Sequence, residues 1–584
     1  MFATSVLLAI AGALGIFYWY RKSKLLFLKK VGIDGPQPDV FFGNLAEMAN
    51  KPLFRLYLDW RQKYGNVFGY YEGPVPVIVT SDLEILKQVF VKKFSNFHSR
   101  KYYPLQPDPD DTAVHMLSAQ GERWKRLRTI INPTFSATKM KLMSPLIHRS
   151  IDDMMDKLKA HNETGEPIEI YSRYQGLTLD VIGSCAFGMD VQSQKDPNDP
   201  FLFRCRQIFM DGSTRPFLLM IALLIPEFGK FWNLLLKLIH QFKEDPTKWL
   251  TSALANIITL RKNEEYRRVD LLQLMLDAEE VSTRSYSKLT MTRDSNTRIS
   301  TDGSDEDEIG VKQANGTHAD NNRASCSPRL NGKLKNGHVT TTNGHANGYA
   351  NGTAYDSVWN DKPPKKALSH EEIKAQSVLF LLAGYETTST AMAYITYELV
   401  MNPPVQEKLQ EEIDRLCPKE AELTYDMVHN MPYMEMVISE VLRKYPLVST
   451  ITNRLCMESC TINGVFIPKG AVVQANVWAI HYDPDIWGPV DPKEFYPERF
   501  SPDYRGARRH PMAWMPFGAG PRNCVGMRFA FLEMKLSLVR ILQNYTLTRC
   551  EQTQVPLEFR EGGTIVPRDG VQITIHDRQN IGHR

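Results

Sequence analysis

One cysteine near the C-terminus, Cys524, lies in a segment whose residue types could hold a metal. Residues 517–526 read Phe-Gly-Ala-Gly-Pro-Arg-Asn-Cys-Val-Gly. The glycines at 518 and 520 permit dihedral angles and close approaches that a Cβ atom would block, so the backbone can pass against a flat ligand. A free cysteine beside a turn is more often buried and inert. The flanking residues favour instead a thiolate that ligates a metal.

An amphipathic helix is expected directly after this segment. Its apolar residues recur at helical spacing: Met527, Ala530, Phe531, Met534, Leu538, Ile541 and Leu542. The helix would place Cys524 at its N-terminus, where the partial positive charge favours thiolate over thiol. Backbone N–H groups at that terminus could also tune the sulfur.

These ten residues resemble the haem-binding signature of the cytochromes P-450. The signature Phe-x-x-Gly-x-Arg-x-Cys-x-Gly is filled at every fixed position. The resemblance implies an iron protoporphyrin whose iron is ligated by Cys524, with Phe517, Arg522 and Gly526 among the cofactor-binding residues. A thiolate ligand donates electron density that favours O–O cleavage, which histidine-ligated globins avoid.

A second candidate site lies in a long, mostly apolar helical stretch at residues 371–400, which is interrupted by Ala-Gly-Tyr-Glu-Thr-Thr at 383–388. The Thr387 hydroxyl can bond an upstream carbonyl or a water, and Gly384 leaves room at the helix surface. Glu386 could connect that hydroxyl to solvent protons. In isolation a Glu-Thr pair indicates a solvated face or an N-cap. The apolar setting and the resemblance to the family's oxygen-activation motif favour catalytic roles for Glu386 and Thr387.

A charged pair lies one helical turn apart at Glu440 and Arg443, so the two side chains can meet on one face. Such pairs usually lie on the surface. Together with Arg499, in the sequence Pro-Glu-Arg-Phe, they resemble the family's Glu-x-x-Arg and its later arginine. The resemblance implies a buried, structural charge network that braces the segment leading to Cys524. Breaking such a network costs about 3–5 kcal/mol.

The two carboxylates of haem need arginine forks or indole N–H donors. Trp124 and Arg128, one turn apart, resemble the Trp-x-x-x-Arg of the family's helix near the haem, and Arg454 and Arg522 occupy the other propionate-binding positions. The neighbouring basic residues are expected to project outward and to form a patch for an acidic electron donor: Arg123, Lys125 and Arg126. A net charge of only +4, with no basic run, argues against nucleic-acid binding.

The first twenty residues predict a membrane anchor. Residues 2–20 carry no charge and precede a basic stretch. A helix of this length spans roughly 28 Å, near the hydrocarbon thickness of a bilayer. The charge follows the apolar run and no small-residue cleavage site comes after it, which favours an uncleaved anchor over a signal peptide and a catalytic body on the cytoplasmic side.

A basic, proline-rich connector at residues 21–49 follows the anchor, and one catalytic domain at 50–584 follows the connector. Residues 283–366 are rich in Ser, Thr, Asn, Gly and Asp and predict a disordered insertion within that domain. The eight cysteines form no Cys-x-x-Cys pair and no regular framework, which favours a reducing compartment.

The resemblance covers nearly the whole chain apart from the insertion, and local detail is similar to the drug- and steroid-oxidising 3A branch. It implies a mainly α fold with a smaller β-rich lobe and haem between the helix at 371–400 and the Cys524 loop. It also implies a monooxygenase of the endoplasmic reticulum membrane that inserts one oxygen atom from O2 into a lipophilic substrate. NADPH would supply the electrons through a membrane-bound flavoprotein reductase.

Two other functions use the same cofactor. A thromboxane-synthase-like isomerase would rearrange an endoperoxide without oxygen or reductase, but its hallmark is loss of the Glu-Thr pair, which is present here. A non-enzymatic haem binder would not need the oxygen-activation residues. Substrate identity lies in loops that the sequence does not define, and only an apolar run between Pro216 and Pro226 indicates a segment near the membrane or a buried helix.

Overall fold

The computed structural model describes residues 2–578, apart from residues 103–110, 197, 212–220, 265–267, 280–366, 420 and 505–508 and short stretches between 226 and 244. The predicted insertion and most of the apolar run at 216–226 therefore lie outside the described residues.

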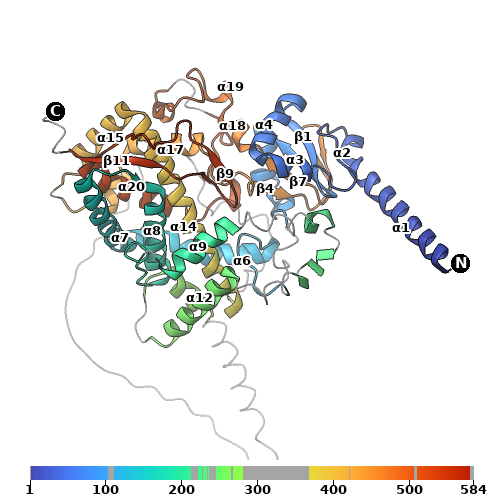
Figure 1. The fold of residues 1–584 in the computed structure, drawn as a ribbon, viewed down its shortest axis with the longest axis horizontal. Coiled ribbons are helices and arrows are strands. Elements are labelled where there is room, and N and C mark those ends of the chain that lie inside the picture. The colour runs from blue at the N-terminus through green and yellow to red at the C-terminus, as the bar shows by residue number, and fades with distance from the viewer. Residues whose placement is uncertain are drawn as a thin grey trace, which may run out of the picture. The chain divides into compact units, whose positions relative to one another are not determined.

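Helices make up most of the described chain, as expected (Figure 1). The α-helices are α1 Phe2–Leu25, α2 Phe27–Lys30, α3 Leu45–Asn50, α4 Leu53–Tyr64, α5 Leu83–Lys87, α6 Gly121–Ile131, α7 Ala137–Thr164, α8 Ile170–Phe187, α9 Pro200–Asp211, α12 Pro246–Lys262, α14 His370–Met401, α15 Pro403–Leu416, α16 Tyr425–His429, α17 Pro432–Lys444, α18 Val477–His481, α19 Pro484–Trp487 and α20 Met527–Asn544.

The strands form small sheets. They are β1 Val67–Glu72, β2 Val75–Thr80, β3 Ile168–Glu169, β4 Asn453–Leu455, β5 Cys460–Ile462, β6 Val465–Ile467, β7 Val472–Ala475, β8 Tyr545–Thr548, β9 Phe559–Glu561, β10 Ile565–Pro567 and β11 Gln572–Asp577. The largest sheet has the order β1-β2-β7-β4, in which β2 and β7 are parallel and the other pairs antiparallel. It joins β2 to the segment that carries Arg454, and it has a hydrophobic core of its own.

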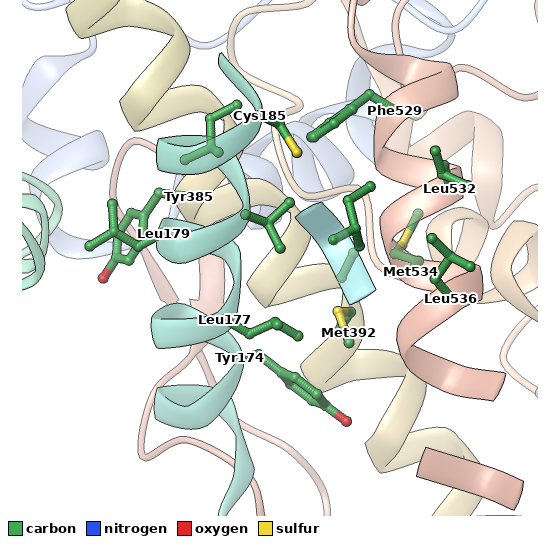
Figure 2. Packing of buried hydrophobic residues seen from close by; sticks show 14 of the residues in the cluster. Tyr174, Leu177, Leu179, Cys185, Tyr385, Met392, Phe529, Leu532, Met534 and Leu536 are labelled. Atoms are coloured by element: carbon green, nitrogen blue, oxygen red, sulfur yellow. The ribbon is translucent and has the colours of Figure 1, made fainter. Parts of the chain in front are cut away.

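The main hydrophobic core lies between α7, α8, α14, α17 and α20. Figure 2 shows side chains from α8, α14 and α20 meeting there. Those with almost no exposed surface include Tyr174, Leu177, Met392, Met534 and Leu536. This packing fixes the helix that carries Thr387 against the helix that follows Cys524.

The start of α14 is set by a capping box. The Ser369 hydroxyl accepts a hydrogen bond from the Glu372 N–H at 3.2 Å, and the Glu372 carboxylate accepts one from the Ser369 N–H at 3.1 Å. Pro403, which cannot continue the α14 helix, begins α15 after Asn402. The observed bounds agree with the helix predicted at 371–400.

The segment predicted as a membrane anchor, residues 1–20, is helical from Phe2. The helix α1 continues five residues beyond it and ends at Leu25, within the predicted connector. Among the described helices, none combines the length and the apolar character needed to cross a membrane. The anchor therefore stays a prediction.

Close packing of α8 on α14 depends on Gly384. A Cβ atom there would lie 2.8 Å from Cγ1 of Ile182 on α8. The space left by this glycine is thus filled by a neighbouring helix, which differs from the open helix surface expected from the sequence.

Gly384→Ala is expected to destabilise the protein through overpacking, which costs about 1–3 kcal/mol. The higher helix propensity of alanine offsets roughly 1 kcal/mol of this cost. Thermal unfolding followed by circular dichroism measures the effect. In an Ile182→Ala background the clash is absent, so the same change should become neutral or stabilising. An equal loss in both backgrounds would show that Ile182 is not the cause.

Candidate functional site

The Cys524 loop is a tight turn held by its own backbone. The Gly518 N–H donates to the Met515 carbonyl at 3.0 Å, and the Cys524 N–H donates to the Phe517 carbonyl at 2.9 Å. Gly520 has a φ of 70°, and a Cβ atom there would lie 1.9 Å from the Phe90 carbonyl oxygen. The close approach that this glycine permits is therefore to protein backbone. Helix α20 begins three residues after Cys524, as the periodicity predicted.

The Cys524 thiol is the exposed member of the described cysteines. Burial among protein atoms raises its pKa, whereas the backbone N–H groups of Gly526 and Met527 and the cations Arg128 and Arg100 lower it. Burial outweighs these donors and cations, so the pKa of the thiol is raised on balance, and a bound metal would have to supply the remaining stabilisation of the thiolate.

Four arginines gather around this loop. Arg128 donates to the Asn523 carbonyl at 2.8 Å, Arg454 donates to the Ala519 carbonyl at 3.1 Å, and Arg100 donates to the Arg522 carbonyl at 3.2 Å. The Arg522 guanidinium lies 4.7 Å from the centre of the Trp124 ring. The structure thus brings the predicted propionate-binding residues together at the Cys524 loop.

The charge of this cluster is not balanced by protein. Desolvation lowers the pKa of all four arginines, and the other arginines lower further those of Arg100, Arg454 and Arg522. Within the described part of the chain, no carboxylate forms an ion pair with any of them. The Nε atoms of Arg100, Arg454 and Arg522 are buried without a hydrogen-bond partner. Buried cations of this kind need anions to compensate their charge. The two propionates of haem would supply two carboxylates.

Arg100 was missed by the sequence analysis. It lies in the segment between β2 and α6, at no helical spacing from Trp124 or Arg128, and only folding brings it to the loop. No local pattern indicated its role.

Thr387 and Glu386 point to different surroundings although they are neighbours on α14. The Thr387 hydroxyl donates to the Ala383 carbonyl at 2.7 Å, as expected for a threonine that bonds one turn back. Glu386 is buried, with 1% of its surface exposed, and it accepts hydrogen bonds from Tyr171 and Gln175 of α8. The carboxylate therefore contacts α8 and makes no direct contact with solvent.

Two of the basic residues expected to project outward do not. Arg123 and Arg126 of α6 both form ion pairs with Glu372 at the start of α14, with nitrogen–oxygen distances of 3.0 and 2.5 Å. The outward orientation predicted for these two residues was wrong, because a buried carboxylate on a distant segment lies within their reach.

Glu440, Arg443 and Arg499 form one fully buried ion-pair network. The Glu440 carboxylate lies 2.7 Å from Arg443 Nε and 3.1 Å from Arg499 Nε. Both guanidiniums also donate to backbone carbonyls of the segment 481–494. The contacts continue through His481, which hydrogen-bonds to the Arg443 carbonyl and accepts from the Met515 N–H at 3.0 Å. This path leads to the Cys524 loop.

His481 was not singled out from the sequence. Desolvation and the nearby Arg443 lower its pKa to about 3, so the ring is neutral and Nε2 can accept a hydrogen bond from the Met515 N–H. A single histidine in an apolar stretch carries no signal for this role.

The comparison with protein families decides what this site belongs to. The family model described as cytochrome P-450 matches residues 33–298 and 352–575. The chain belongs to the cytochrome P-450 family. Membership of this family makes the protein a monooxygenase. A P-450 carries a cysteine-ligated haem and takes electrons from NADPH through a redox partner.

Curated relatives match this P-450 over nearly their whole length. Cytochrome P-450 3A29 of Sus scrofa is 33% identical over 99% of this chain and 97% of its own. Lithocholate 6-beta-hydroxylase of Mesocricetus auratus is 33% identical over 98% and 97%, and putative cytochrome P-450 CYP13A3 of Caenorhabditis elegans is 34% identical over 96% and 97%. The similarity to the 3A branch agrees with the resemblance seen in the sequence.

Glu440→Ala is expected to destabilise this P-450 by about 3–5 kcal/mol, because it leaves two buried guanidiniums without their carboxylate. Glu498→Ala is the matched control: it removes an exposed ion pair with Lys408, where the two side chains are 29% and 51% exposed, and should cost about 0–1 kcal/mol. Urea unfolding compares the two. Similar losses for both variants would contradict the bracing role of Glu440.

Proposed function

We propose that Cys524 ligates the haem iron of a monooxygenase that inserts one oxygen atom from O2 into a lipophilic substrate. The observation that supports this assignment is the cluster of arginines, without an ion-paired carboxylate among the described residues, around an exposed thiol. When bound, the haem would activate O2 with two electrons, and the second oxygen atom would leave as water.

The residues of this chain would hold and orient the cofactor. Arg128, Arg454 and Arg522, with Trp124, would bind the propionates, and Arg100 adds a fourth cation. At the sulfur, the Gly526 N–H stabilises the thiolate. Phe517 packs its ring 5.7 Å from that of Phe531 on α20, which supports the loop from the helix side. These contacts fix the loop relative to α20.

From α14, Thr387 and Glu386 would hold and move protons for the reaction that the cofactor supplies. The Thr387 hydroxyl would hold a water close to the reacting oxygen, and Glu386 would supply protons to that water. Glu440, Arg443 and Arg499 would act structurally, because their network is fully buried and is linked to the loop through His481.

We also propose an electron-transfer partner, a cellular location and a substrate class. The electrons would pass through a membrane-bound flavoprotein reductase. The protein would lie at the endoplasmic reticulum membrane, held by the N-terminal helix with its catalytic domain on the cytoplasmic side. A relative named for lithocholate supports a steroid or another lipid of similar size as substrate.

Cys524→Ser should abolish the strongly red-shifted Soret band of the reduced carbon monoxide complex, because serine does not supply a thiolate. Cys550→Ser, at a half-buried thiol near β8, is the control and should keep the band. Absorption spectra of the purified, reduced proteins test both. An unchanged band in Cys524→Ser would refute the assignment of the ligand.

Thr387→Ala should leave NADPH consumption in place while product falls and hydrogen peroxide rises. A positioned proton donor typically contributes about 10²–10⁴-fold, part of which an ordered water can recover. Thr387→Ser keeps the hydroxyl and should restore most of the coupling. Product per NADPH and peroxide yield are measured together. Normal coupling in Thr387→Ala would return this residue to the role of a helix hydroxyl that only bonds the Ala383 carbonyl.

A further inference from the structure

The carboxylate of Glu386 is held from α8, on the side of α14 that packs against that helix. The Tyr171 hydroxyl donates to Glu386 Oε1 at 2.6 Å, and the Gln175 amide donates to Oε2 at 3.3 Å. Both donors lie on α8, one helical turn apart. Each carboxylate oxygen therefore has its own donor from one rigid helix.

The contacts continue from Gln175 toward α9. The side-chain amide oxygen of Gln175, Oε1, accepts a hydrogen bond from Arg206 Nε at 3.0 Å, and Arg206 is only half-buried. The line from Arg206 through Gln175 thus joins the buried carboxylate to a charged residue with access to solvent. Other charged or titratable groups also act on Glu386 or respond to its charge: Arg560 on β9, Cys205 on α9 and Tyr385 on α14.

We propose that Tyr171 is a positioning residue for proton delivery: its hydroxyl holds the Glu386 carboxylate in the charged form and against α8, and Gln175 extends this hold to Arg206. The inference rests on the proposed function of Glu386. It adds a residue, outside the predicted site, that decides when the carboxyl is free to turn.

The balance of interactions at Glu386 explains how the hold works. On balance the pKa of Glu386 is raised, because burial outweighs the effects that lower it; the hydrogen bond from Tyr171 is the largest of these, followed by Gln175, Arg560 and Arg206. Burial and the neighbouring carboxylate raise the pKa of Tyr171, so the phenol keeps its proton and acts only as a donor. Because the Tyr171 hydroxyl keeps its proton, it can only donate a hydrogen bond. That hydrogen bond stabilises the Glu386 carboxylate and is much weaker once the carboxyl is protonated.

This gives Glu386 two states. As a carboxylate it is held by Tyr171 and Gln175. When a transient chain of waters from the side of half-buried Arg206 delivers a proton to the carboxylate, the charge that attracted both donors is gone, and the carboxylic acid can turn along α14 toward Thr387. It gives that proton to the water held there, becomes a carboxylate again and returns to Tyr171. Tyr171 itself neither gains nor loses a proton in this cycle.

Tyr171→Phe removes the hydroxyl and keeps the ring, so the pKa of Glu386 should rise by about one unit. The matched control is Tyr174→Phe. Tyr174 lies on the same helix (Figure 2) and is fully buried. Its hydroxyl bonds α14 at the Thr396 hydroxyl, at 2.7 Å, and not at Glu386. Both variants lose one buried hydroxyl between α8 and α14, and only one loses the contact with the carboxylate.

The decisive measurement is an infrared titration of the carboxylic acid C=O band in the haem-loaded protein, assigned to Glu386 by its loss in Glu386→Gln. The midpoint should move to higher pH in Tyr171→Phe and stay at the wild-type value in Tyr174→Phe. Unchanged midpoints in both, or equal shifts in both, would overturn the inference. Because this readout needs no turnover, it remains decisive even if the proposed monooxygenase reaction fails.

Turnover gives a second test with lithocholate as the probe. The pH dependence of hydrogen peroxide released per NADPH should shift to higher pH in Tyr171→Phe and not in Tyr174→Phe. If Tyr171→Phe does not retain haem, Gln175→Met removes the weaker donor and should shift the infrared midpoint in the same direction by less. A Gln175→Met protein with the wild-type midpoint would then count against the hold.

Discussion

The organisation of this site depends on buried positive charge that the protein does not neutralise. Arg100, Arg128, Arg454 and Arg522 arrive from four segments distant in sequence and meet at the loop that presents Cys524. Within the protein they bond mainly to backbone carbonyls, which supply dipoles and no net charge. The fold therefore reserves a place for a ligand with acidic groups beside a thiol, and the position of that ligand is set before it binds.

A second set of buried charges, unlike the arginine cluster, is neutralised within the protein. Glu440, Arg443 and Arg499 satisfy one another and the surrounding carbonyls, so this network needs nothing from outside. Through neutral His481 and the Met515 N–H, it supports the loop that carries the uncompensated cluster. One charge network is thus satisfied within the protein, and the other is the one that we propose binds the cofactor.

Local sequence patterns predicted the helices around the site well, because a periodic run such as residues 371–400 decides its own secondary structure. They failed where the outcome depends on segments that meet only in the fold. Arg100 joins the cluster from a region without helical spacing, Tyr171 reaches Glu386 from another helix, and Ile182 fills the space beside Gly384. None of these meetings leaves a trace in the spacing of residues along the chain.

The first turn of α14 has a consequence for the residues that precede it in the sequence. Glu372 takes part in the capping box with Ser369 and binds Arg123 and Arg126, which flank Trp124 on α6. The chain is thereby fastened within a few residues of re-entering the described fold. Whatever length of sequence precedes Ser369, α14 starts at the same point relative to α6. Lineages could lengthen, shorten or diversify the preceding segment while the geometry of the catalytic centre stays under separate selection.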